Sequence, residues 1–529
     1  MLHTTLSLPL FALVASASAL IQGDCISSDP GLKWLATKLH KTSAISCKGQ
    51  SLQQYNSGRH FGVQHNIAAS VVVFPATKQD VKFAVQAANK STLGSNFAVV
   101  GGAYGQTNAA SAAGFVIDLS WLNSTHVLKD VKVSDTTIPA AIAYQGGATW
   151  HQVKAVTAGS GYTAVGAQVG EVGVGGFSTT GGTGYLTGAY GFASDRLAAM
   201  EVVLMSGEIV NATKTNQHKD LFWALQGGGG QFGIVTTFYQ TAAAEPKTVD
   251  VGFHVIDDAH LPMARHRTVK FFSTNKDPFS LMFYVVGYIP SDITTGSYAV
   301  KTLLYTLRFS DPSNPNQASY NTTFAPLLAG LNISSSLSQP SIPFAEIQDW
   351  ADAYFPTGFR RAHTGAQISV PTAAYLASAT AQLKSHVDAL LKAGDDPRSA
   401  LWALQYVHPG LNGHLPASDT ETAWPHAVVG HQALFSAAWR EGKNDALVAK
   451  QSRAFNALAR AVQAKQRRVV LSDNPGYAVP GEKATTVYGG NMARLIAVKE
   501  KYDPECRLRK GRVFASAGCV EGKWANMFA

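Results

Sequence analysis

The chain has 529 residues and a mass of 56.1 kDa, with 46% apolar and only 15% charged residues. This composition excludes a charge-rich disordered chain and provides enough apolar material for large buried cores. The 48 glycines follow no Gly-X-Y period, which excludes collagen. The net charge is +9, but basic and aromatic residues are not interleaved as they are in a nucleic-acid-binding surface, so we expect no nucleic-acid partner.

The N-terminus has the features of a secretory signal. Residues 6–20 are almost all apolar or small, a run too short for a membrane span of about 20 residues. Ala17-Ser18-Ala19 forms an A-x-A cleavage site. We therefore expect residues 1–19 to be a signal peptide and the mature chain to be secreted or lumenal, without a membrane partner. A buried N-terminal helix is the alternative.

The four cysteines lie near the two ends of the chain, at Cys25, Cys47, Cys506 and Cys519. Their even number and local clustering suggest the bridges Cys25–Cys47 and Cys506–Cys519, although three connectivities are possible. No CxxC or histidine spacing accompanies them, so we expect no metal site. Five N-x-S/T sequons predict N-glycans, at Asn89, Asn123, Asn211, Asn321 and Asn332.

Short strands and a helix are predicted in the first part of the chain. The apolar β-branched run Val71–Phe74 predicts a strand, and the helix that follows begins at Thr77 with Asp80 as its capping-box partner. Further strands are predicted over 97–100 and 115–119. This alternation indicates an α+β or α/β unit.

The next segment is rich in glycine. Residues 159–191 contain twelve glycines in 33 positions, a density that should prevent a conventional helix. A hairpin is predicted over 200–205 and 208–212, then a short helix over 220–225 and a strand over 232–239.

The character of the sequence changes near residue 246, where glycine becomes sparse. Strand-like runs at 282–289 and 302–309 alternate with helical apolar spacing at 371–392 and 432–464, and an interruption of the second helical run is expected near Gly442. The tail returns to a Gly-Gly turn and a predicted helix over 491–502. The sequence thus divides into the signal peptide and four further parts: 20–61, 62–245, 246–484 and 485–529.

Glycine-rich turns are the motifs that suggest a ligand. Gly228–Gly233 matches GxGxxG, but a predicted helix precedes it and a strand follows, the reverse of a dinucleotide fingerprint. Gly101–Gln106 forms one turn, and Gly173–Gly176 with Gly181–Gly184 forms another. Such turns present unpaired backbone N–H groups to anions, and two of them suit a cofactor with a pyrophosphate. Ordinary turns are the alternative.

Five sequence blocks in a fixed order carry a resemblance to a known family. They are FPATKQDVKFAVQAANK, VVGGAYGQTNAASAAGFVIDLSWLN, VGVGGFSTTGGTGYLTGAYGFASDRLAAMEVVLMSGEIV, NQHKDLFWALQGGGGQFGIVTTF and VYGGNMARLIAVKEKYDP. Together they resemble the FAD-binding oxidoreductases of the vanillyl-alcohol oxidase superfamily, and specifically its berberine-bridge-enzyme-like branch in fungal, secreted form.

The resemblance implies an α+β fold. A two-subdomain FAD-binding domain of PCMH type would span 62–245, and an α+β substrate domain with an antiparallel sheet flanked by helices would span 246–484. Residues 485–529 would return to the FAD domain. The implied FAD-binding residues are Gly101, Gly102, Ala103, Tyr104, Gly105, Gln106, Val172, Gly175, Gly176, Gly181, Gly182, Gly184, Gly233, Val235 and Asn491.

Departures from the family pattern concern the cofactor anchors and the base. Many relatives attach FAD through a histidine where this chain has Ala103, and bicovalent relatives add a cysteine where it has Val169. We therefore expect dissociable FAD. The family's Tyr-x-Asn motif is also missing from 470–474, where Asp473 is a candidate base because a carboxylate in an apolar pocket would have a raised pKa. A simple Asp-Asn-Pro-Gly turn is the alternative.

Other candidates complete the expected site. Asn474 and Tyr406 join Asp473 as catalytic candidates, and Tyr284 and His426 are candidates for the substrate pocket. The expected activity is removal of a hydride from an alcohol or activated C–H of a small organic molecule, a secondary metabolite, with O2 as acceptor. The alternatives are a redox-neutral isomerase or cyclase that binds FAD, and a binding protein without activity. Carbohydrate oxidation is less expected because the bicovalent anchors are absent.

Overall fold

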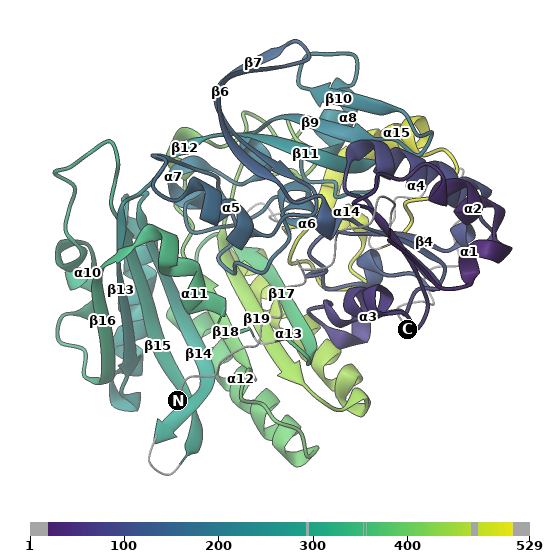
Figure 1. The fold of residues 1–529 in the computed structure, drawn as a ribbon. Helices are drawn as coiled ribbons and strands as arrows, with labels where there is room; N and C mark the ends of the chain where they lie inside the picture. The colour runs from purple at the N-terminus through teal and green to yellow at the C-terminus, as the bar shows by residue number, and fades with distance from the viewer. Residues whose placement is uncertain (1–19, 293–295, 353, 356, 467–473, 511–529) are drawn as a thin grey trace.

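The computed structural model describes residues 20–292, 296–352, 354–355, 357–466 and 474–510. Its first layer is a five-stranded sheet formed by residues 20–118, at the right in purple (Figure 1). The strand order is β1 (Leu20–Gln22), β2 (Ala44–Cys47), β3 (Val71–Phe74), β5 (Phe115–Asp118) and β4 (Phe97–Val100). The pairs β3–β5 and β4–β5 are parallel.

Two local features predicted for this part of the chain are present in the structure. Helix α4 (Lys78–Lys90) begins with a capping box in which Thr77 and Asp80 satisfy each other's backbone N–H groups. The disulfide Cys25–Cys47 joins α1 (Cys25–Ser28) to β2 and confirms one predicted bridge. Cys519, the other predicted partner, lies outside the described residues. Short helices α2 (Pro30–Ala36) and α3 (Ser51–Gly58) complete this layer.

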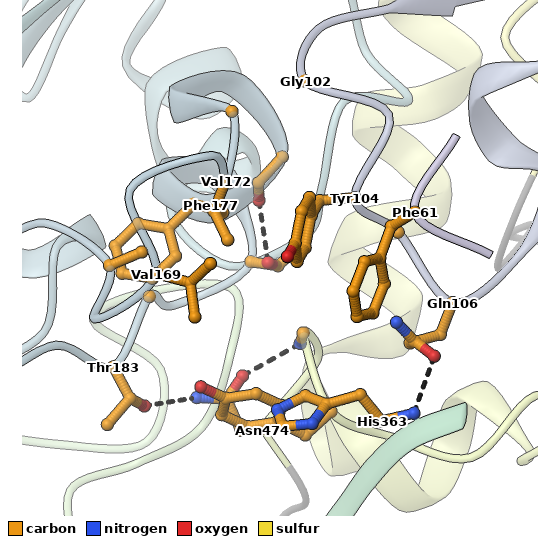
Figure 2. Close-up of a pocket in the computed structure, with 18 of the residues that line it drawn as sticks. Phe61, Gly102, Tyr104, Gln106, Val169, Val172, Phe177, Thr183, His363 and Asn474 are labelled. Atoms are coloured by element: carbon orange, nitrogen blue, oxygen red, sulfur yellow. Dashed lines mark hydrogen bonds between the residues drawn. The ribbon is translucent and has the colours of Figure 1, made fainter. Parts of the chain in front are cut away.

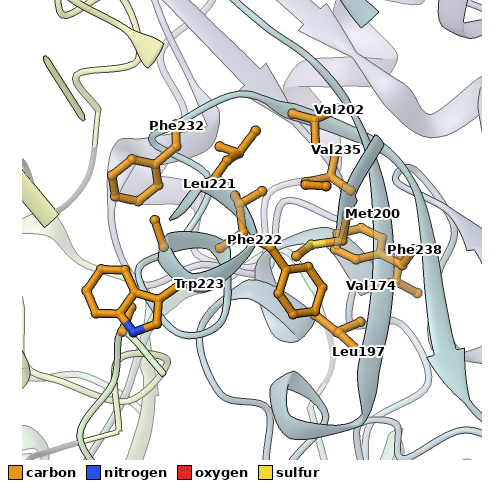
Figure 3. Close-up of a cluster of buried hydrophobic side chains, with 14 of the residues drawn as sticks. Val174, Leu197, Met200, Val202, Leu221, Phe222, Trp223, Phe232, Val235 and Phe238 are labelled. Atoms are coloured by element: carbon orange, nitrogen blue, oxygen red, sulfur yellow. The ribbon is translucent and has the colours of Figure 1, made fainter. Parts of the chain in front are cut away.

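A second five-stranded sheet is antiparallel. Its order is β10 (Ile209–Thr213), β9 (Leu197–Val203), β11 (Ile234–Thr241), β7 (Thr136–Gln145) and β6 (Thr125–Val133). Helices α8 (Lys219–Leu225) and α15 (Met492–Tyr502) share its apolar core, in which Met200, Phe222 and Phe238 are buried together (Figure 3). The tail of the chain thus packs against this sheet. Smaller elements nearby are α5 (Trp150–Thr157), α6 (Val174–Thr179), α7 (Thr187–Tyr190), α14 (Ala484–Tyr488) and the pair β8 (Tyr162–Thr163) and β12 (Ala243–Ala244).

The middle of the chain builds a seven-stranded antiparallel sheet. Its order is β16 (Ile333–Pro343), β13 (Thr248–Ile256), β15 (Ser297–Phe309), β14 (Ser280–Asp292), β18 (Leu401–Gln405), β19 (His431–Trp439) and β17 (Arg360–Ile368). One face carries the helices α9 (Leu261–Thr274), α10 (Tyr320–Leu328), α12 (Ala373–Lys392) and α13 (Asp445–Lys465). The other face turns toward the first two sheets, with α11 (Ile347–Asp352) beside it (Figure 1).

Two segments differ from their predicted structure. The predicted helix over 432–464 is wrong in its first part, because residues 431–439 form β19 and only 445–465 are helical. All nine residues of β19 are buried, so the alternation that identifies a half-exposed strand is absent from its alanine-rich sequence. The glycine-rich segment 159–191 also contains two short helices, α6 and α7, of one to two turns.

The predicted α+β class is confirmed: mixed and antiparallel sheets are flanked by helices. Among helices in the described ranges, none combines the length and hydropathy that a bilayer crossing requires.

Candidate active site

A cavity of about 1040 Å³ lies between the first two sheets and the face of the seven-stranded sheet opposite α9, α10, α12 and α13. Its lining includes Gly102 and Tyr104 after β4 and Val172 before α6 (Figure 2). Phe283 on β14 also lines it. The volume is just above the range of about 300–1,000 Å³ that is usual for small-molecule pockets. The cavity can therefore hold a large cofactor, or a cofactor together with a small substrate.

The turn after β4 presents unpaired main-chain donors to this cavity. Every residue from Gly101 to Gln106 contributes to the lining. Within the described part of the chain, none of the backbone N–H groups of residues 102–106 donates a hydrogen bond. Ala103 adopts a φ of 56°, in the left-handed region. Consecutive unpaired N–H groups in such a turn form a concave site for an anion such as a diphosphate.

This turn packs directly against the segment before α6. A Cβ atom on Gly102 would lie 2.3 Å from the backbone N of Gly173, and one on Gly173 would lie 2.3 Å from the backbone N of Gly102. Only glycine allows this approach, which places the two predicted turns on one wall of the cavity. Val172, Gly175 and Gly176 line that wall as well.

The second predicted turn is divided between lining and packing. Gly182 lines the cavity, but Gly181 and Gly184 do not. A Cβ on Gly181 would meet the Trp424 ring at 3.0 Å, and one on Gly184 would lie 1.9 Å from the carbonyl oxygen of Gly166. Both glycines permit close packing behind the wall instead.

A third glycine-rich segment reaches the cavity from the loop between α8 and β11. Gly233 and Val235 line it, as expected, together with the preceding turn 228–231. Asn491 does not. Its Nδ2 donates to the carbonyl oxygens of Asp419 at 2.7 Å and Thr422 at 3.1 Å, so it fastens a loop of the middle domain.

The seven-stranded sheet supplies the opposite wall, and its alternation decides which side chains reach the cavity. On β14, Phe283 and Val285 line the cavity, whereas Tyr284 is buried among the helices. Tyr406 lies on the same, helix-covered side of the sheet as Tyr284. Its hydroxyl donates to the carbonyl oxygen of Asn275 at 2.8 Å, away from the cavity. The structure therefore brings neither tyrosine to the candidate site.

Aromatic residues that sequence analysis missed line this wall instead. They are Phe253 on β13, Phe283 on β14, Tyr305 on β15 and Trp350 on α11. The alternation of β13, β14 and β15 could have separated two faces of the sheet, but no sequence signal identified the face opposite the helices.

Among the polar side chains that face the cavity are those of His363 and Asn474 (Figure 2). Asn474 donates from Nδ2 to Thr183 Oγ1 at 3.2 Å and accepts from the Gly476 N–H at 2.9 Å. Burial, with Arg361 nearby, lowers the pKa of His363 to about 4, so its ring is neutral at pH 7. Nδ1 of His363 has no hydrogen-bond partner within the described residues. Asp473 lies outside the described residues.

His426, a pocket candidate, belongs to a buried ion pair away from the cavity. Its Nε2 donates to Asp195 Oδ1 at 2.9 Å and its Nδ1 donates to the carbonyl oxygen of Trp424 at 2.7 Å. Burial alone would lower the pKa of His426, but the Asp195 carboxylate raises it above the ordinary value. The pair fixes the Trp424–His426 loop to the FAD-side part of the chain.

A second histidine–carboxylate contact joins α5 to α11. His151 Nε2 pairs with Asp352 Oδ2, and the Gly170 N–H donates to Asp352 Oδ1 at 2.8 Å. The hydrogen bond to Asp352 raises the pKa of His151. Asp349 is also close: the candidate ligand atoms of His151, Asp349 and Asp352 all lie within 4.8 Å of one another, a spacing that could hold a metal ion.

Comparisons with known proteins bear on this site. Residues 69–213 match the family model described as FAD binding domain. The FAD-linked oxidoreductase pgmH of Aspergillus terreus is 36% identical over 171 residues, 32% of each chain, so this chain spans about a third of the length of that relative. The FAD-dependent monooxygenase drtC of Aspergillus calidoustus is 26% identical over 84% of this chain and 82% of its own.

A solved structure covers nearly the whole chain. BBE-like 1 of Physcomitrella patens superposes with a TM-score of 0.73 at 16% identity, over 93% of this chain and 100% of its own. At that identity the likeness establishes the fold.

Proposed function

We propose that this chain, which carries an FAD-binding domain and has the fold of the berberine-bridge-enzyme-like branch of the vanillyl-alcohol oxidase superfamily, is an FAD-dependent oxidase. It would remove a hydride from an alcohol or an activated C–H of a small organic molecule, with O2 as acceptor. The observation that carries the proposal is the single cavity that joins the unpaired N–H groups of residues 102–106 to an apolar wall of the middle domain.

The residues present fit FAD. The main-chain donors of residues 102–106 suit its diphosphate. Cβ atoms on Gly105 or Gly176 would meet no atom within 4 Å, so these glycines leave open space along the cavity. The cavity wall around Val172 and Phe177 is apolar and suits the flat ring system. Bound FAD supplies a hydride acceptor, and the protein supplies orientation and proton handling.

We propose that the FAD is dissociable. Ala103 and Val169 both line the cavity, at the positions where the family resemblance expects a histidine and a cysteine anchor. A methyl group and an isopropyl group cannot form a bond to a flavin. Retention would then depend on the main-chain donors and on burial alone.

The chain's own polar groups would position the substrate. Asn474 is held in one orientation by Thr183 and Gly476, which leaves its amide fixed at the cavity surface. The neutral ring of His363 can donate or accept one hydrogen bond there without adding charge. Both groups can orient a hydroxyl or carbonyl group of a substrate.

We propose further that the protein is secreted and glycosylated. The Cys25–Cys47 bridge suits an oxidising compartment. Four of the five sequon asparagines are exposed, and Asn123 is half-buried.

Two measurements test the function. Purified protein denatured in acid and filtered should release its yellow colour into the filtrate; colour retained on the protein would overturn dissociable FAD. The holoprotein should then be bleached anaerobically by its substrate and regain its absorbance in air, with one H2O2 formed per substrate. Product formed without bleaching would replace the oxidase proposal with the redox-neutral alternative. Ligand binding with neither product nor bleaching would overturn both.

A further inference from the structure

We propose that the sheet side of the cavity binds a planar aromatic ring system through the edges of a column of four side chains. The column consists of Phe283, Tyr305, Phe253 and Trp350, all of which line the cavity. This inference rests on the proposed function and names the class of its substrate.

The column follows the register of the sheet. Tyr305 on β15 lies directly opposite Phe283 on β14 and opposite Phe253 on β13. The rings of Phe253 and Tyr305 stack with centroids 4.3 Å apart and planes inclined by 5°, and those of Phe283 and Tyr305 lie 5.4 Å apart at 19°. Trp350 extends the column from α11, at 5.8 Å and 3° from Phe253.

This arrangement determines what the wall offers to a ligand. Rings that stack along the sheet use their faces on one another, so they present edges to the cavity. The edge of an aromatic ring carries partial positive charge and attracts the negative face of another ring. A planar aromatic substrate laid across these edges therefore gains several edge-to-face contacts, whereas a saturated molecule of equal size gains only apolar burial.

The apolar character of the sheet side of the cavity points away from saccharides. Among the described lining residues, Arg398, Glu482 and Lys510 carry charge. Arg398 is paired with Asp396, and Glu482 is paired with Arg460. A sugar would bury many hydroxyl groups against the apolar wall, and each hydroxyl left without a partner there weakens binding. Polar side chains elsewhere in the lining, including His363 and Asn474, suit the oxygen substituents of an aromatic molecule.

The test measures binding to the purified holoprotein by calorimetry with three probes of defined shape. These are 1,8-dihydroxyanthraquinone, a perhydroanthracene that carries hydroxyl groups at the same four positions, and cellobiose. The aromatic probe should bind at least tenfold more tightly than either of the others. Equal or tighter binding of perhydroanthracene would reduce the site to a plain apolar cavity, and preferential binding of cellobiose would overturn the proposal.

Two substitutions test whether the aromatic ligand contacts the column. Phe253→Leu keeps an apolar side chain but removes the central ring, and it should weaken binding of the anthraquinone about three- to tenfold. Phe435→Leu is the matched control, since Phe435 stacks on Phe455 on the helix-covered face of the same sheet. It should change the dissociation constant less than twofold. If Phe253→Leu does not fold, Trp350→Leu at the end of the column serves instead. An unchanged affinity in a folded variant overturns the proposal.

Failure here is distinguishable from failure of the oxidase function. A holoprotein that is bleached by cellobiose but not by aromatic alcohols would keep the oxidase function and lose the substrate class. Anthraquinone binding that depends on Phe253, in a protein whose flavin no substrate bleaches, would keep the binding site and lose the oxidase function.

Discussion

The backbone N–H of His363 donates a hydrogen bond of 2.7 Å to Oε1 of Gln106, so the glycine turn after β4 is joined to the outermost strand of the seven-stranded sheet. Gln64 makes a similar contact two residues earlier on β17, at Arg361. It accepts from the Arg361 N–H at 3.0 Å and donates to the Arg361 carbonyl oxygen at 2.6 Å. The two glutamine side chains take the place of a neighbouring strand, which ties both walls of the cavity together.

Replacing Gln106 with leucine should weaken both stability and cofactor retention. The His363 N–H would lose its acceptor, a loss worth about 1–3 kcal/mol. Gln64→Leu is the matched control because Gln64 also binds the edge of β17 but does not line the cavity. We expect both variants to melt at lower temperature and only Gln106→Leu to lose FAD on gel filtration. Equal retention by the two would contradict a role of Gln106 at the cofactor.

Replacing Gly102 with alanine should abolish FAD binding. The new Cβ would lie 2.3 Å from the backbone of Gly173, so one of the two turns must move away. Gly58→Ala is the control, since a Cβ there meets nothing within 4 Å. The ratio of flavin to protein absorbance after purification measures the effect. A Gly102→Ala protein with full flavin content would show that the close contact is not needed.

The His426–Asp195 pair should make stability depend on pH. The folded-state pKa of His426 is raised, so its contribution is fully present below the unfolded value of about 6.5 and is lost as pH rises through the folded pKa. The melting temperature should therefore fall between pH 6 and pH 9. Asp195→Asn should cost about 3–5 kcal/mol at pH 6 and less at pH 9, because it breaks a buried pair that is charged mainly at the lower pH. A variant with the same loss at both pH values would refute the charged pair.

Lys499 and Asp503 form a second buried pair, and it supports the cavity. The Lys499 Nζ donates to Asp503 Oδ2 at 2.6 Å and to the carbonyl oxygen of Gln231 at 2.7 Å, and Gln231 lines the cavity. Both side chains of the pair are fully buried. Lys499→Met should cost about 3–5 kcal/mol because a buried carboxylate loses its counter-ion.

The double variant separates charge from packing. Lys499→Met with Asp503→Asn removes both charges, and the single asparagine oxygen can replace only one of the two carboxylate oxygens that accept from the Arg507 and Leu508 N–H groups. It should recover part of the stability lost in Lys499→Met, measured by urea unfolding. If the double variant loses as much stability as Lys499→Met and Asp503→Asn lose together, the two charges do not interact.

The sequence predicted those parts of the structure that depend on local signals. The capping box at Thr77 and the turn at Gly101–Gln106 are specified by neighbouring residues, and both are present. Strand β19 could not be recognised, because a strand buried on both faces has no alternation. The roles of Tyr406 and Tyr284 depended on which face of the sheet meets the helices, a tertiary property. Asn491 illustrates a further limit, since its partners are main-chain oxygens of a loop distant in sequence.

Helix α15 supports the cavity but is synthesised long after the turn that it supports. The turn at 228–231 leaves the ribosome early, but Lys499, which holds it through Gln231, is made only near the end of the chain. Translation proceeds from the N-terminus, so the earlier sheets can fold while this support is still missing. We therefore expect stable cofactor binding only after α15 has been made and has packed against this turn. A chain terminated before Lys499 should accumulate as a colourless protein.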